Sequence, residues 1–440
     1  AALINTPARI VVFWLVSKYF GGYLIKSMGK NEKTQRFSSY ANGFQAVPRL
    51  GLKRISCLME LLGDPQERLH CIHVAGTNGK GSVCAFVSSA LISAGYKVGM
   101  FVSPFIVDFC ERIQINGEYI GKDDLCRLSK RVIDTGVSLT EFEFITAVGF
   151  LFFSENKIDV AVLETGLGGR FDATNAIPAP CLSIITKIGL DHTAILGDTV
   201  SQIAEEKCGI IKGTKTVTSF NQPAEALSVI KAHSPCVIMP QKNSLNDIKI
   251  NILGNSFVYE GDFYETSLGG EYQIENALTA IEALKNCGLK IDKSHIKCGL
   301  KAAFMPARLE VISRKPLVVI DGAHNPDGAR ALGSALKEYS DITAIIGVMR
   351  DKNYNQVLAE TLPLCKNAIC VKPTVSRALP VEELAVKAQN YCKNVFASNT
   401  LDDALTLAKS RCDGNPIFIF GSLYLAAEAR PLLKTENHRI

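Results

Sequence analysis

The stretch HVAGTNGKGSVCAFVSSAL, residues 73–91, decides the fold. Its glycines lie between an apolar run and a longer segment in which apolar residues recur every three or four positions. This order predicts a strand at residues 69–74, a glycine-rich loop, and a helix at residues 82–94 that Gly95 ends. Such a loop presents free backbone N–H groups and the positive end of a helix dipole to an anion. The stretch therefore predicts a phosphate-binding loop.

The loop departs from the common pattern G-x-x-x-x-G-K-[ST] of phosphate loops. Val74 stands in place of the first glycine, Gly81 stands where Ser or Thr is expected, and Ser82 comes one residue late. A glycine-rich turn without a ligand is the alternative interpretation. The strand–loop–helix context favours a nucleotide, with Lys80 reaching its outer phosphates.

Short apolar runs alternate with helical patterns along the rest of the first two thirds of the chain. Strands are expected at residues 98–102, 159–164 and 181–188, and a helix at residues 144–153. Buried strands that alternate with helices predict a doubly wound, mostly parallel α/β sheet. Residues 243–270 instead alternate polar and apolar side chains, which predicts a small antiparallel region.

A second cycle of strands and helices follows the proline-containing segment FMPAR at residues 304–308. Strands are expected at residues 317–321, 343–348 and 417–420, and a helix begins near Asp327. This pattern predicts a smaller, Rossmann-like α/β domain. We therefore divide the chain into an N-terminal extension of unknown role (1–29), a nucleotide-binding domain (30–303) and a C-terminal domain (304–440).

The bulk composition argues against several classes of function. The 440 residues are 47% hydrophobic and 21% charged, and the net charge of +5 comes without a dense basic block, so no nucleic-acid partner is expected. The apolar run IVVFWLV at residues 10–16 is too short for a membrane-spanning helix. The 14 cysteines are scattered without metal-ligand spacing, which indicates reduced thiols and a cytoplasmic protein.

Two polar side chains follow expected strands at the edge where the phosphate loop lies. Glu164 ends the strand at residues 159–164, and His192 follows the strand at residues 181–188. Ligands of open parallel sheets bind at the carboxyl ends of the strands, so both should face the loop and hold a hard cation. For His192 the alternative is a capping or core histidine. The sequence NKID at residues 156–159 matches a guanine-selecting pattern, but it precedes its strand and is therefore expected to be a helix-to-strand turn at the opposite edge.

Ten segments place these residues in a larger context. In chain order they are GTNGKGS, SPFIVDFCERIQING, LETGLGGRFDATN, LDHTAILG, IAEEKCGIIK, ENALTAIEAL, MPARLEV, VVIDGAHNPDGARAL, GVMRDKNY and FGSLYLAAE. From about residue 36 to residue 433, the chain thereby resembles the folylpolyglutamate synthase/dihydrofolate synthase family, a branch of the Mur ligase superfamily. Members of this family use ATP to convert a carboxylate into an acyl phosphate, which the amino group of L-glutamate then attacks.

The resemblance also implies site residues, by position. Lys80, Lys207 and His324 would be catalytic, and Lys207 matches a lysine that is carbamylated in family members. An ion pair with Glu205 or Glu206 is the alternative for Lys207, and a structural role at a helix start is the alternative for His324. Two Mg²⁺ ions are implied, with Ser103, Glu164 and His192 as metal ligands. The implied ATP contacts are Gly76, Thr77, Asn78, Gly79, Lys80, Gly81, Ser82, Asn276, Arg308 and Asp321.

The substrate side rests on fewer residues. The implied folate contacts are Phe105, Thr140, Glu141, Phe142, Glu143, Phe171, Asp172 and Ala173, and Phe142 could either stack on a flat ring or anchor the core. Bifunctional members often carry SPHL where this chain has Ser103-Pro104-Phe105-Ile106. The missing histidine favours folylpolyglutamate synthase activity over dihydrofolate synthase activity, and leaves both open.

The resemblance implies folate or dihydropteroate and L-glutamate as small-molecule partners of a monomer. Two other functions are alternatives to this ligase activity. Another Mur-type ligase acting on a UDP-muramoyl peptide conflicts with the SPF…ERIQING and DATN segments. A P-loop NTP hydrolase or nucleotide-binding module would need no amino-acid site.

Overall fold

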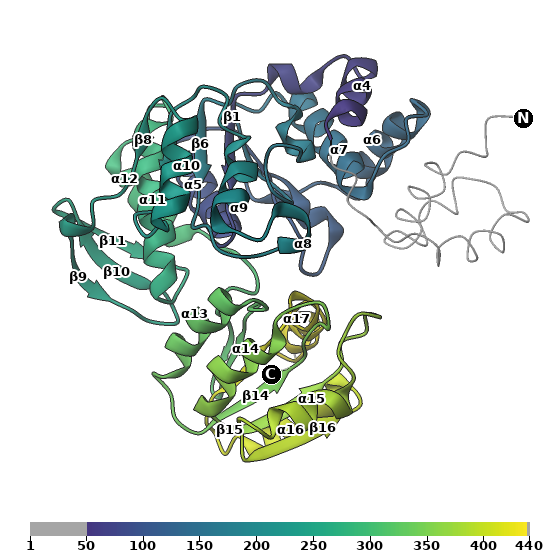
Figure 1. The fold of residues 1–440 in the computed structure, drawn as a ribbon, viewed down its shortest axis with the longest axis vertical. Helices are drawn as coiled ribbons and strands as arrows, with labels where there is room; N and C mark the ends of the chain where they lie inside the picture. The colour runs from purple at the N-terminus through teal and green to yellow at the C-terminus, as the bar shows by residue number, and fades with distance from the viewer. Residues whose placement is uncertain (1–50, 438–440) are drawn as a thin grey trace, which may run out of the picture.

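The computed structural model describes residues 51–437, so the expected N-terminal extension at residues 1–29 lies outside the described part of the chain. Within residues 51–437 the strands form sheets of eight, three and six members. Two α/β bodies carry them, one above the other in Figure 1: an N-terminal unit (51–302) and a C-terminal unit (310–437). The predicted α/β class is confirmed. The predicted domain boundary at residue 304 falls in the linker between the units, residues 303–309, and stays a prediction.

The eight-stranded sheet is mostly parallel, as expected. Its order is β4-β3-β2-β5-β1-β6-β7-β8, and only the short strands β3 and β4 at one end run antiparallel to their neighbours. Strand β1 therefore lies between β5 and β6, in register at Val74↔Glu164 and Ala75↔Ile185. The elements of this part are α4 Lys53–Leu61, η1 Pro65–Arg68, β1 Cys71–Ala75, α5 Lys80–Ser93, β2 Val98–Phe101, η2 Phe109–Arg112, β3 Ile113–Ile115, β4 Glu118–Tyr119, α6 Lys122–Asp134, α7 Glu141–Glu155, β5 Val160–Glu164, η3 Ala173–Ala176, β6 Leu182–Ile185, α8 Thr193–Leu196, α9 Val200–Cys208, β7 Thr216–Thr218, α10 Ala224–His233 and β8 Val237–Ile238.

Side chains that alternate along the central strands bury both faces of this sheet. Ile72 and Val74 of β1 belong to the core under α5, α11 (Glu271–Asn286) and α12 (Lys293–Ala302). Cys71 of the same strand, with Leu163 of β5, belongs to the core under α4, α6 and α7. Because successive side chains of a strand point to opposite faces, the sheet is covered on both sides, which confirms the doubly wound architecture.

The antiparallel region predicted at residues 243–270 is also confirmed. Strands β9, β10 and β11 pair antiparallel, and the rings of Phe257 and Tyr264 stack at 5.7 Å between their centroids. Both rings are buried in the core that contains α5 and α11, so the small sheet packs on the side of the N-terminal unit (Figure 1). Its elements are η4 Lys242–Ser244, β9 Leu245–Lys249, β10 Asn255–Tyr259, β11 Asp262–Thr266, α11 Glu271–Asn286 and α12 Lys293–Ala302.

The C-terminal unit is built around the six-stranded sheet β12-β13-β17-β14-β15-β16, which is parallel except for β12. Helices α13, α14 and α15 bury one face of it, and α16 and α17 bury the other. The predicted Rossmann-like alternation is thus confirmed. The elements are β12 Glu310–Arg314, β13 Leu317–Ile320, α13 Pro326–Leu336, β14 Ile342–Ile346, α14 Tyr354–Thr361, η5 Leu362–Leu364, β15 Cys365–Val371, α15 Val381–Ala388, β16 Asn394–Ser398, α16 Leu401–Arg411, β17 Ile417–Phe420 and α17 Leu423–Asn437.

Three smaller expectations can be compared with the structure. Asn156 caps the C-terminus of α7 and Asp159 accepts from the backbone N–H of Lys97, so the NKID segment is a helix-to-strand turn as predicted. All 14 cysteines are free thiols. None of the helices between residues 51 and 437 combines the length and apolarity needed to cross a membrane.

Candidate active site

The glycine-rich loop joins β1 to α5 and is held against two other elements. Gly79 has a φ of +90°, and a Cβ added to it would lie 2.2 Å from the side-chain oxygen of Asn276 on α11. A Cβ on Gly76, whose φ is +153°, would lie 1.8 Å from the hydroxyl of Thr186, just after β6. Only glycine fits at either position, because the backbone is both left-handed and crowded. The loop is therefore shaped before any ligand binds.

Two lysines converge on one carbonyl of this loop. Lys80 donates from Nζ to the carbonyl oxygens of Gly76 (3.2 Å) and Thr77 (3.3 Å). Lys207, buried on α9, donates from Nζ to the same Gly76 oxygen at 2.8 Å. Burial, with the charge of Lys80 as a second cause, lowers the pKa of Lys207 to about 7. This accumulation of positive charge suits a polyanion such as a triphosphate.

The ion-pair alternative for Lys207 does not occur in the described residues. Glu205 pairs instead with Arg170 at 2.7 Å and with His233 at 3.1 Å. Glu206 lies 3.7 Å from Arg170. Lys207 thus contributes a buried amine of lowered pKa whose role in carbamylation stays a prediction.

A pocket of about 300 Å³, part of it open to solvent, lies beside these lysines. The loop after β1, the loop after β5 and the start of α8 form its walls. Its lining residues are Gly76, Thr77, Lys80, Thr165, Gly166, Leu167, Gly168, Asp191, His192, Leu196 and Lys207. Three sheet loops at one edge therefore enclose the space next to the phosphate loop, as the strand order requires.

Glu164 ends β5 inside the protein, beside the loop. Its Oε2 accepts from the backbone N–H of Ser103 at 3.1 Å. Burial raises the pKa of this carboxyl, while the charge of Lys80 and the hydrogen bond from Ser103 oppose the rise. A buried carboxylate beside a lysine is suited to a hard cation, and the structure brings Ser103 and Glu164 together as expected.

His192 is the third expected metal ligand, and it lies in the same pocket. It is the N-cap residue of α8 with a φ of +51°, and its side chain is 46% exposed. Its ring nitrogen Nε2 lies 3.9 Å from Asp191, and the pKa of the imidazole is lowered by burial, with Lys80 and Lys207 among the smaller causes. Lys80 therefore acts electrostatically on both Glu164 and His192.

The three expected ligands do not form a ready-made metal cage. Between residues 51 and 437, no three or more His, Cys, Asp or Glu side chains are placed to hold a metal ion. Mg²⁺ does not require such a cage, because it usually keeps several waters and binds through one or two carboxylates together with substrate phosphates. The assignment of Ser103, Glu164 and His192 as ligands stays a prediction.

The remaining phosphate-loop contacts come from α11. Gln273 donates from Nε2 to the hydroxyl of Ser82 at 3.1 Å, and Asn276 donates from Nδ2 to the Oε1 of Gln273 at 2.9 Å. Ser82 is buried by this arrangement. The late position of Ser82 in the motif thus places its hydroxyl against α11, while the side-chain oxygen of Asn276 is directed at Gly79.

The linker adds Arg308 at the facing edge, and the C-terminal unit adds Asp321 and His324. Asp321 follows β13 and accepts from the backbone N–H groups of Leu309 and Ala323, each at 2.8 Å. Burial raises the pKa of Asp321 and Arg308 opposes this, and Arg308 also acts on Glu164 across the linker. The His324 ring bonds through Nδ1 to the Gly322 carbonyl at 2.8 Å, and burial lowers its pKa to about 4. His324 is thus a neutral imidazole whose Nδ1 donates.

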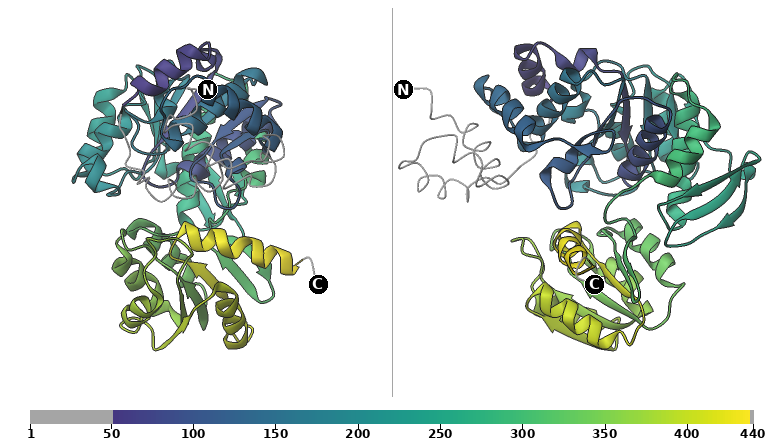
Figure 2. Two further views of the ribbon diagram at one scale, coloured as in Figure 1. Left: turned by 90° about the vertical axis from the view of Figure 1, so that its right-hand side faces the viewer. Right: turned by 180° about the vertical axis from the view of Figure 1, so that it is seen from behind.

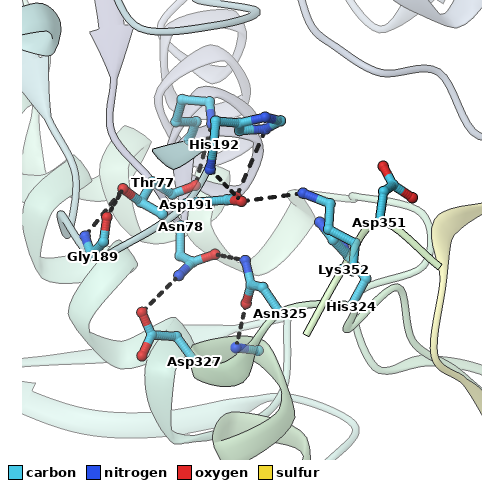
Figure 3. Close-up of polar contacts among 12 residues, drawn as sticks. Thr77, Asn78, Gly189, Asp191, His192, His324, Asn325, Asp327, Asp351 and Lys352 are labelled. Carbon is cyan, nitrogen blue, oxygen red and sulfur yellow. Dashed lines mark hydrogen bonds and ion pairs between the residues drawn. The ribbon is translucent and has the colours of Figure 1, made fainter. Parts of the chain in front are cut away.

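Direct polar contacts join the two units over the phosphate loop (Figure 3). Asn78 donates to Asp327 at 3.4 Å and accepts from Asn325 at 3.2 Å. Lys352, after β14, pairs with Asp191 at 3.1 Å. Sequence reasoning assigned no role to Asn325, Asp327, Asp191 or Lys352, although all four lie in the ten segments. Their signal was a polar residue at or just before the start of a helix.

The expected folate residues fall into two groups, according to what their side chains contact. In the first, Arg112 lies 5.1 Å above the Phe105 ring and 3.7 Å from Glu141. Phe142 contacts Phe101 edge to face, 6.0 Å between centroids, and packs against Gly166. Phe142 is therefore partly a core anchor. The exposed face of Phe171 lies outside that core.

In the second group, the carboxylates of Asp172 and Glu143 already form hydrogen bonds and ion pairs with other residues of the chain. Asp172 accepts from the backbone N–H groups of Gly166 and Leu167, both at 2.9 Å, and from the hydroxyl of Thr174 at 2.5 Å. Thr140 and Glu143 form the capping box of α7. Glu143 also pairs with Arg54 at 3.0 Å, and Ala173 is buried. These residues shape the loop after β5 and the start of α7, and their contact with folate stays a prediction.

Known families match both units. The Mur ligase middle domain matches residues 74–284, and the Mur ligase, glutamate ligase domain matches residues 307–423. The phosphate loop, Glu164, His192 and Lys207 lie in the first match. Arg308, Asp321, His324 and Lys352 lie in the second.

Curated proteins of similar sequence cover almost the whole chain. A folylpolyglutamate synthase of Lacticaseibacillus casei is 36% identical over an alignment of 425 residues, which covers 90% of this chain and 97% of the relative. A dihydrofolate synthase/folylpolyglutamate synthase of Bacillus subtilis is 36% identical over 423 residues, covering 87% and 95% of the two chains.

Solved structures show the same arrangement. Folylpolyglutamate synthase of Mycobacterium tuberculosis, complexed with ADP and AMPPCP, superposes with a TM-score of 0.80 at 31% identity and covers 87% of this chain and 95% of its own. E. coli FolC in complex with DHPP and ADP has a TM-score of 0.80 at 27% identity, with 92% and 98% covered.

Proposed function

The chain belongs to the folylpolyglutamate synthase/dihydrofolate synthase family of Mur ligases, and we propose that it uses ATP to join L-glutamate to the carboxylate of a folate. A carboxylate is a poor electrophile. Transfer of the γ-phosphoryl group of ATP to a carboxylate oxygen gives an acyl phosphate and ADP. The glutamate amine then attacks the acyl carbon, an amide bond forms, and inorganic phosphate leaves with the former carboxylate oxygen.

One observation supports this proposal most directly: the two units meet at the carboxyl edges of their sheets, over the phosphate loop. Lys80 and Glu164 lie on one side of this meeting, and Arg308 acts on Glu164 from the linker. Asn78 of the loop itself is hydrogen-bonded to Asn325 and Asp327 of the C-terminal unit. A nucleotide bound in the loop would therefore be contacted from both units, which suits a reaction between three substrates.

The chain's own residues can stabilise phosphoryl transfer mainly by placing charge. Lys80 is anchored on the Gly76 and Thr77 carbonyls, so its ammonium is already held at the loop. Arg308 would add a second cation from the opposite side. Catalysis of phosphoryl transfer consists largely of such positioning and charge stabilisation. His324, neutral at pH 7, would orient a bound group through its Nε2 atom.

We propose Mg²⁺ as the metal, held by Glu164 and His192 with the oxygen of Ser103. The buried carboxylate of Glu164 fits a cation that takes most of its remaining ligands from phosphate and water. When bound, the metal supplies Lewis-acid charge neutralisation at the phosphate oxygens. A carbamylated Lys207 would turn a buried cation into an anion beside the pocket, and the lowered pKa of its amine supports this, because only a neutral amine reacts with CO₂.

The defining experiment compares acceptors. The protein is incubated with ATP, Mg²⁺ and L-glutamate, offering tetrahydrofolate and dihydropteroate in separate reactions, and the products are weighed by mass spectrometry. We expect tetrahydrofolate to gain one glutamyl residue per ADP released. A UDP-muramoyl peptide offered as a third acceptor should give no product. ADP release that no acceptor stimulates would support a nucleotide hydrolase instead.

The dihydropteroate reaction addresses the second activity. Phe105 stands where bifunctional relatives of the SPHL type have histidine, and here its ring packs beneath Arg112. We therefore propose folylpolyglutamate synthase as the main activity, with weaker use of dihydropteroate. The free cysteines support a reducing compartment, for which we propose the cytoplasm.

A further inference from the structure

The linker that carries Arg308 has an unusual backbone. Ala307 and Leu309, the residues on either side of Arg308, have φ values of +54° and +45°. Residues with a Cβ rarely adopt this left-handed conformation, and they keep it only where the surrounding structure imposes it. Strained backbone of this kind is common at functional sites. The contacts that hold Ala307 and Leu309 in this conformation therefore bear on the function of Arg308.

Two buried carboxylates hold the linker through its backbone. The N–H of Ala307 donates to Glu310 Oε2 at 3.0 Å, and the N–H of Leu309 donates to Asp321 Oδ2 at 2.8 Å. Arg308 itself donates to the Ala307 carbonyl at 3.1 Å. The guanidinium of Arg308 also lies against Gly322. Each strained residue thus has its own carboxylate, and the Arg308 side chain is fixed between them.

Glu310 is in turn held by the last helix of the chain. Arg430 on α17 donates from Nε to both oxygens of Glu310, each at 2.9 Å, and both side chains are largely buried. Arg430 also lies 5.7 Å from the ring of Phe304, at the other end of the linker. Figure 2 shows α17 on the side of the C-terminal unit that faces the N-terminal unit. The pair therefore ties α17 to both ends of the linker.

The other side of the linker touches the phosphate-loop helix. Met305 packs against Gly81, where an added Cβ would lie 2.6 Å from the methionine methyl group. The linker thus contacts both α17 and the phosphate-loop helix, with Arg308 near its C-terminal end. A change at Arg430 would be transmitted to Arg308 by this chain of contacts.

We propose that Glu310 and Arg430 are positioning residues for phosphoryl transfer: they fix the left-handed backbone around Arg308 and so aim its guanidinium at the nucleotide. Neither residue touches the nucleotide itself. The inference rests on the proposed function, because it assigns Arg308 to the ATP site. It adds the last helix, which lies outside the expected site, to the machinery of that reaction.

The first test is steady-state kinetics of Arg430→Met, Arg430→Lys and a matched control, Arg411→Met. Arg411 stacks on Phe396, away from the linker, in the C-terminal unit. Arg411→Met is therefore the same chemical change as Arg430→Met at a site that does not contact Glu310. Arg430→Met should lower kcat/KM for ATP by about ten- to a hundredfold, since small misplacements of a positioned group have effects of this size. KM for glutamate should stay within about twofold, Arg430→Lys should recover most of the loss, and Arg411→Met should match the wild type. An equal loss for all three substrates would overturn the proposal.

The second test is a double-mutant cycle with Arg308→Ala. If Arg430 acts only through Arg308, then Arg430→Met should lower kcat/KM for ATP by less than about twofold in the Arg308→Ala background. If the double variant instead loses kcat/KM for ATP by the product of the two single-variant losses, the proposal is overturned. Should Arg430→Met not fold, as judged by its thermal unfolding, the same cycle is run with Ala307→Gly. Glycine adopts the left-handed backbone freely and does not fix it.

Binding of the non-hydrolysable nucleotide AMPPCP, measured by calorimetry, separates this inference from the proposed function. If the wild type forms no glutamyl product, the proposed function fails. An AMPPCP affinity that Arg430→Met lowers in the wild-type background but not in the Arg308→Ala background would still support the positioning role of Glu310 and Arg430. Unchanged AMPPCP affinity together with unchanged turnover in Arg430→Met would overturn this positioning role and leave the proposed function intact.

Discussion

The two sheet edges that face each other are built in different ways. At the edge of the eight-stranded sheet the site is made by backbone and buried charge: glycines at positions 76 and 79 admit close contacts, and two lysines share one carbonyl. At the edge of the six-stranded sheet the site is made by side chains that reach across, above all Lys352 and Asp327. The first edge is fixed by packing, whereas the second is held to it by a few exchangeable polar contacts.

This difference assigns separate tasks to the two edges. A preorganised loop with two lysines anchored on one of its carbonyls can hold a triphosphate without rearrangement, which is what stabilisation of a charged transition state requires. Long side chains on the facing unit can release and engage again as substrates enter and products leave. Substitutions at the first edge should therefore affect every step, and those at the second should affect mainly the coupling between substrates.

The largest effect is expected at Lys80. Lys80→Met removes the ammonium held on the loop carbonyls and should lower kcat by about 10³-fold, as for loss of a key charge-stabilising group. Lys97→Met is the matched control, because Lys97 bonds the Asn156 carbonyl at the opposite edge of the same sheet. ADP formation in the presence of all substrates is the measurement. Near-normal turnover of Lys80→Met would remove this residue from the mechanism.

Lys207 should show a conflict between stability and function. Lys207→Met should lower kcat by about 10²-fold, since it removes a charge site beside the pocket. It should also raise the unfolding temperature, because burial holds the pKa of the folded-state amine near 7, below its ordinary value of 10.5. The unfolded chain binds the proton more tightly between these values, so protonation destabilises the wild type.

The pH dependence of that stability gain follows from the same shift. In CO₂-free buffer, the gain of Lys207→Met over the wild type should be largest below about pH 7 and should vanish as the pH approaches 10.5. Thermal unfolding across this range is the measurement, and a pH-independent difference would contradict the burial argument.

Activity of Lys207→Ala should be partly restored by short carboxylic acids if Lys207 is carbamylated. Absence of this rescue would count against carbamylation.

A smaller effect is expected from the contact between the units. Lys352→Met breaks the ion pair with Asp191 and should lower kcat/KM for glutamate by about tenfold while leaving AMPPCP affinity within about twofold, in line with the cost of one partly buried charge contact. Lys366→Met, which removes an exposed partner of Asp341, serves as control. A loss of AMPPCP affinity equal to the loss of kcat/KM for glutamate would show that the two sheet edges do not have separate roles in nucleotide binding and substrate coupling.

The smallest effect is expected at the far edge. Asp159→Asn alters the NKID turn, where Asp159 bonds the backbone N–H of Lys97. The ratio of turnover with ATP to turnover with GTP should change by less than about twofold, because this turn lies at the amino end of β5, away from the phosphate loop. A shift toward GTP in this variant would revive a guanine-selecting role.

Sequence reasoning went furthest where the pattern is local or follows from strand direction. The helix after Gly79 shows its apolar positions directly, and Glu164 could be placed beside the loop because parallel strands end at one edge. Strands β3 and β4 were missed, since segments of three and two residues carry too little alternation to be recognised.

Contacts between distant segments could not be predicted in the same way. Lys352 and Asp191 are 161 positions apart, and Gln273 and Ser82 are 191 apart, so no periodicity links them. Asp172 shows a different limit: its motif suggested contact with substrate, yet most of its hydrogen-bonding capacity is used by the loop it shapes. A motif shows which residue matters, and only the fold shows what its side chain touches.

The measurement that tests the central claim most directly follows one oxygen atom. The protein is supplied with ATP, Mg²⁺, L-glutamate and a tetrahydrofolate whose terminal carboxylates carry ¹⁸O, and the released inorganic phosphate is examined by mass spectrometry. An acyl-phosphate route at the loop of Lys80 predicts one ¹⁸O atom in each phosphate released, with ADP as the other product. Phosphate free of ¹⁸O, or AMP in place of ADP, would contradict it.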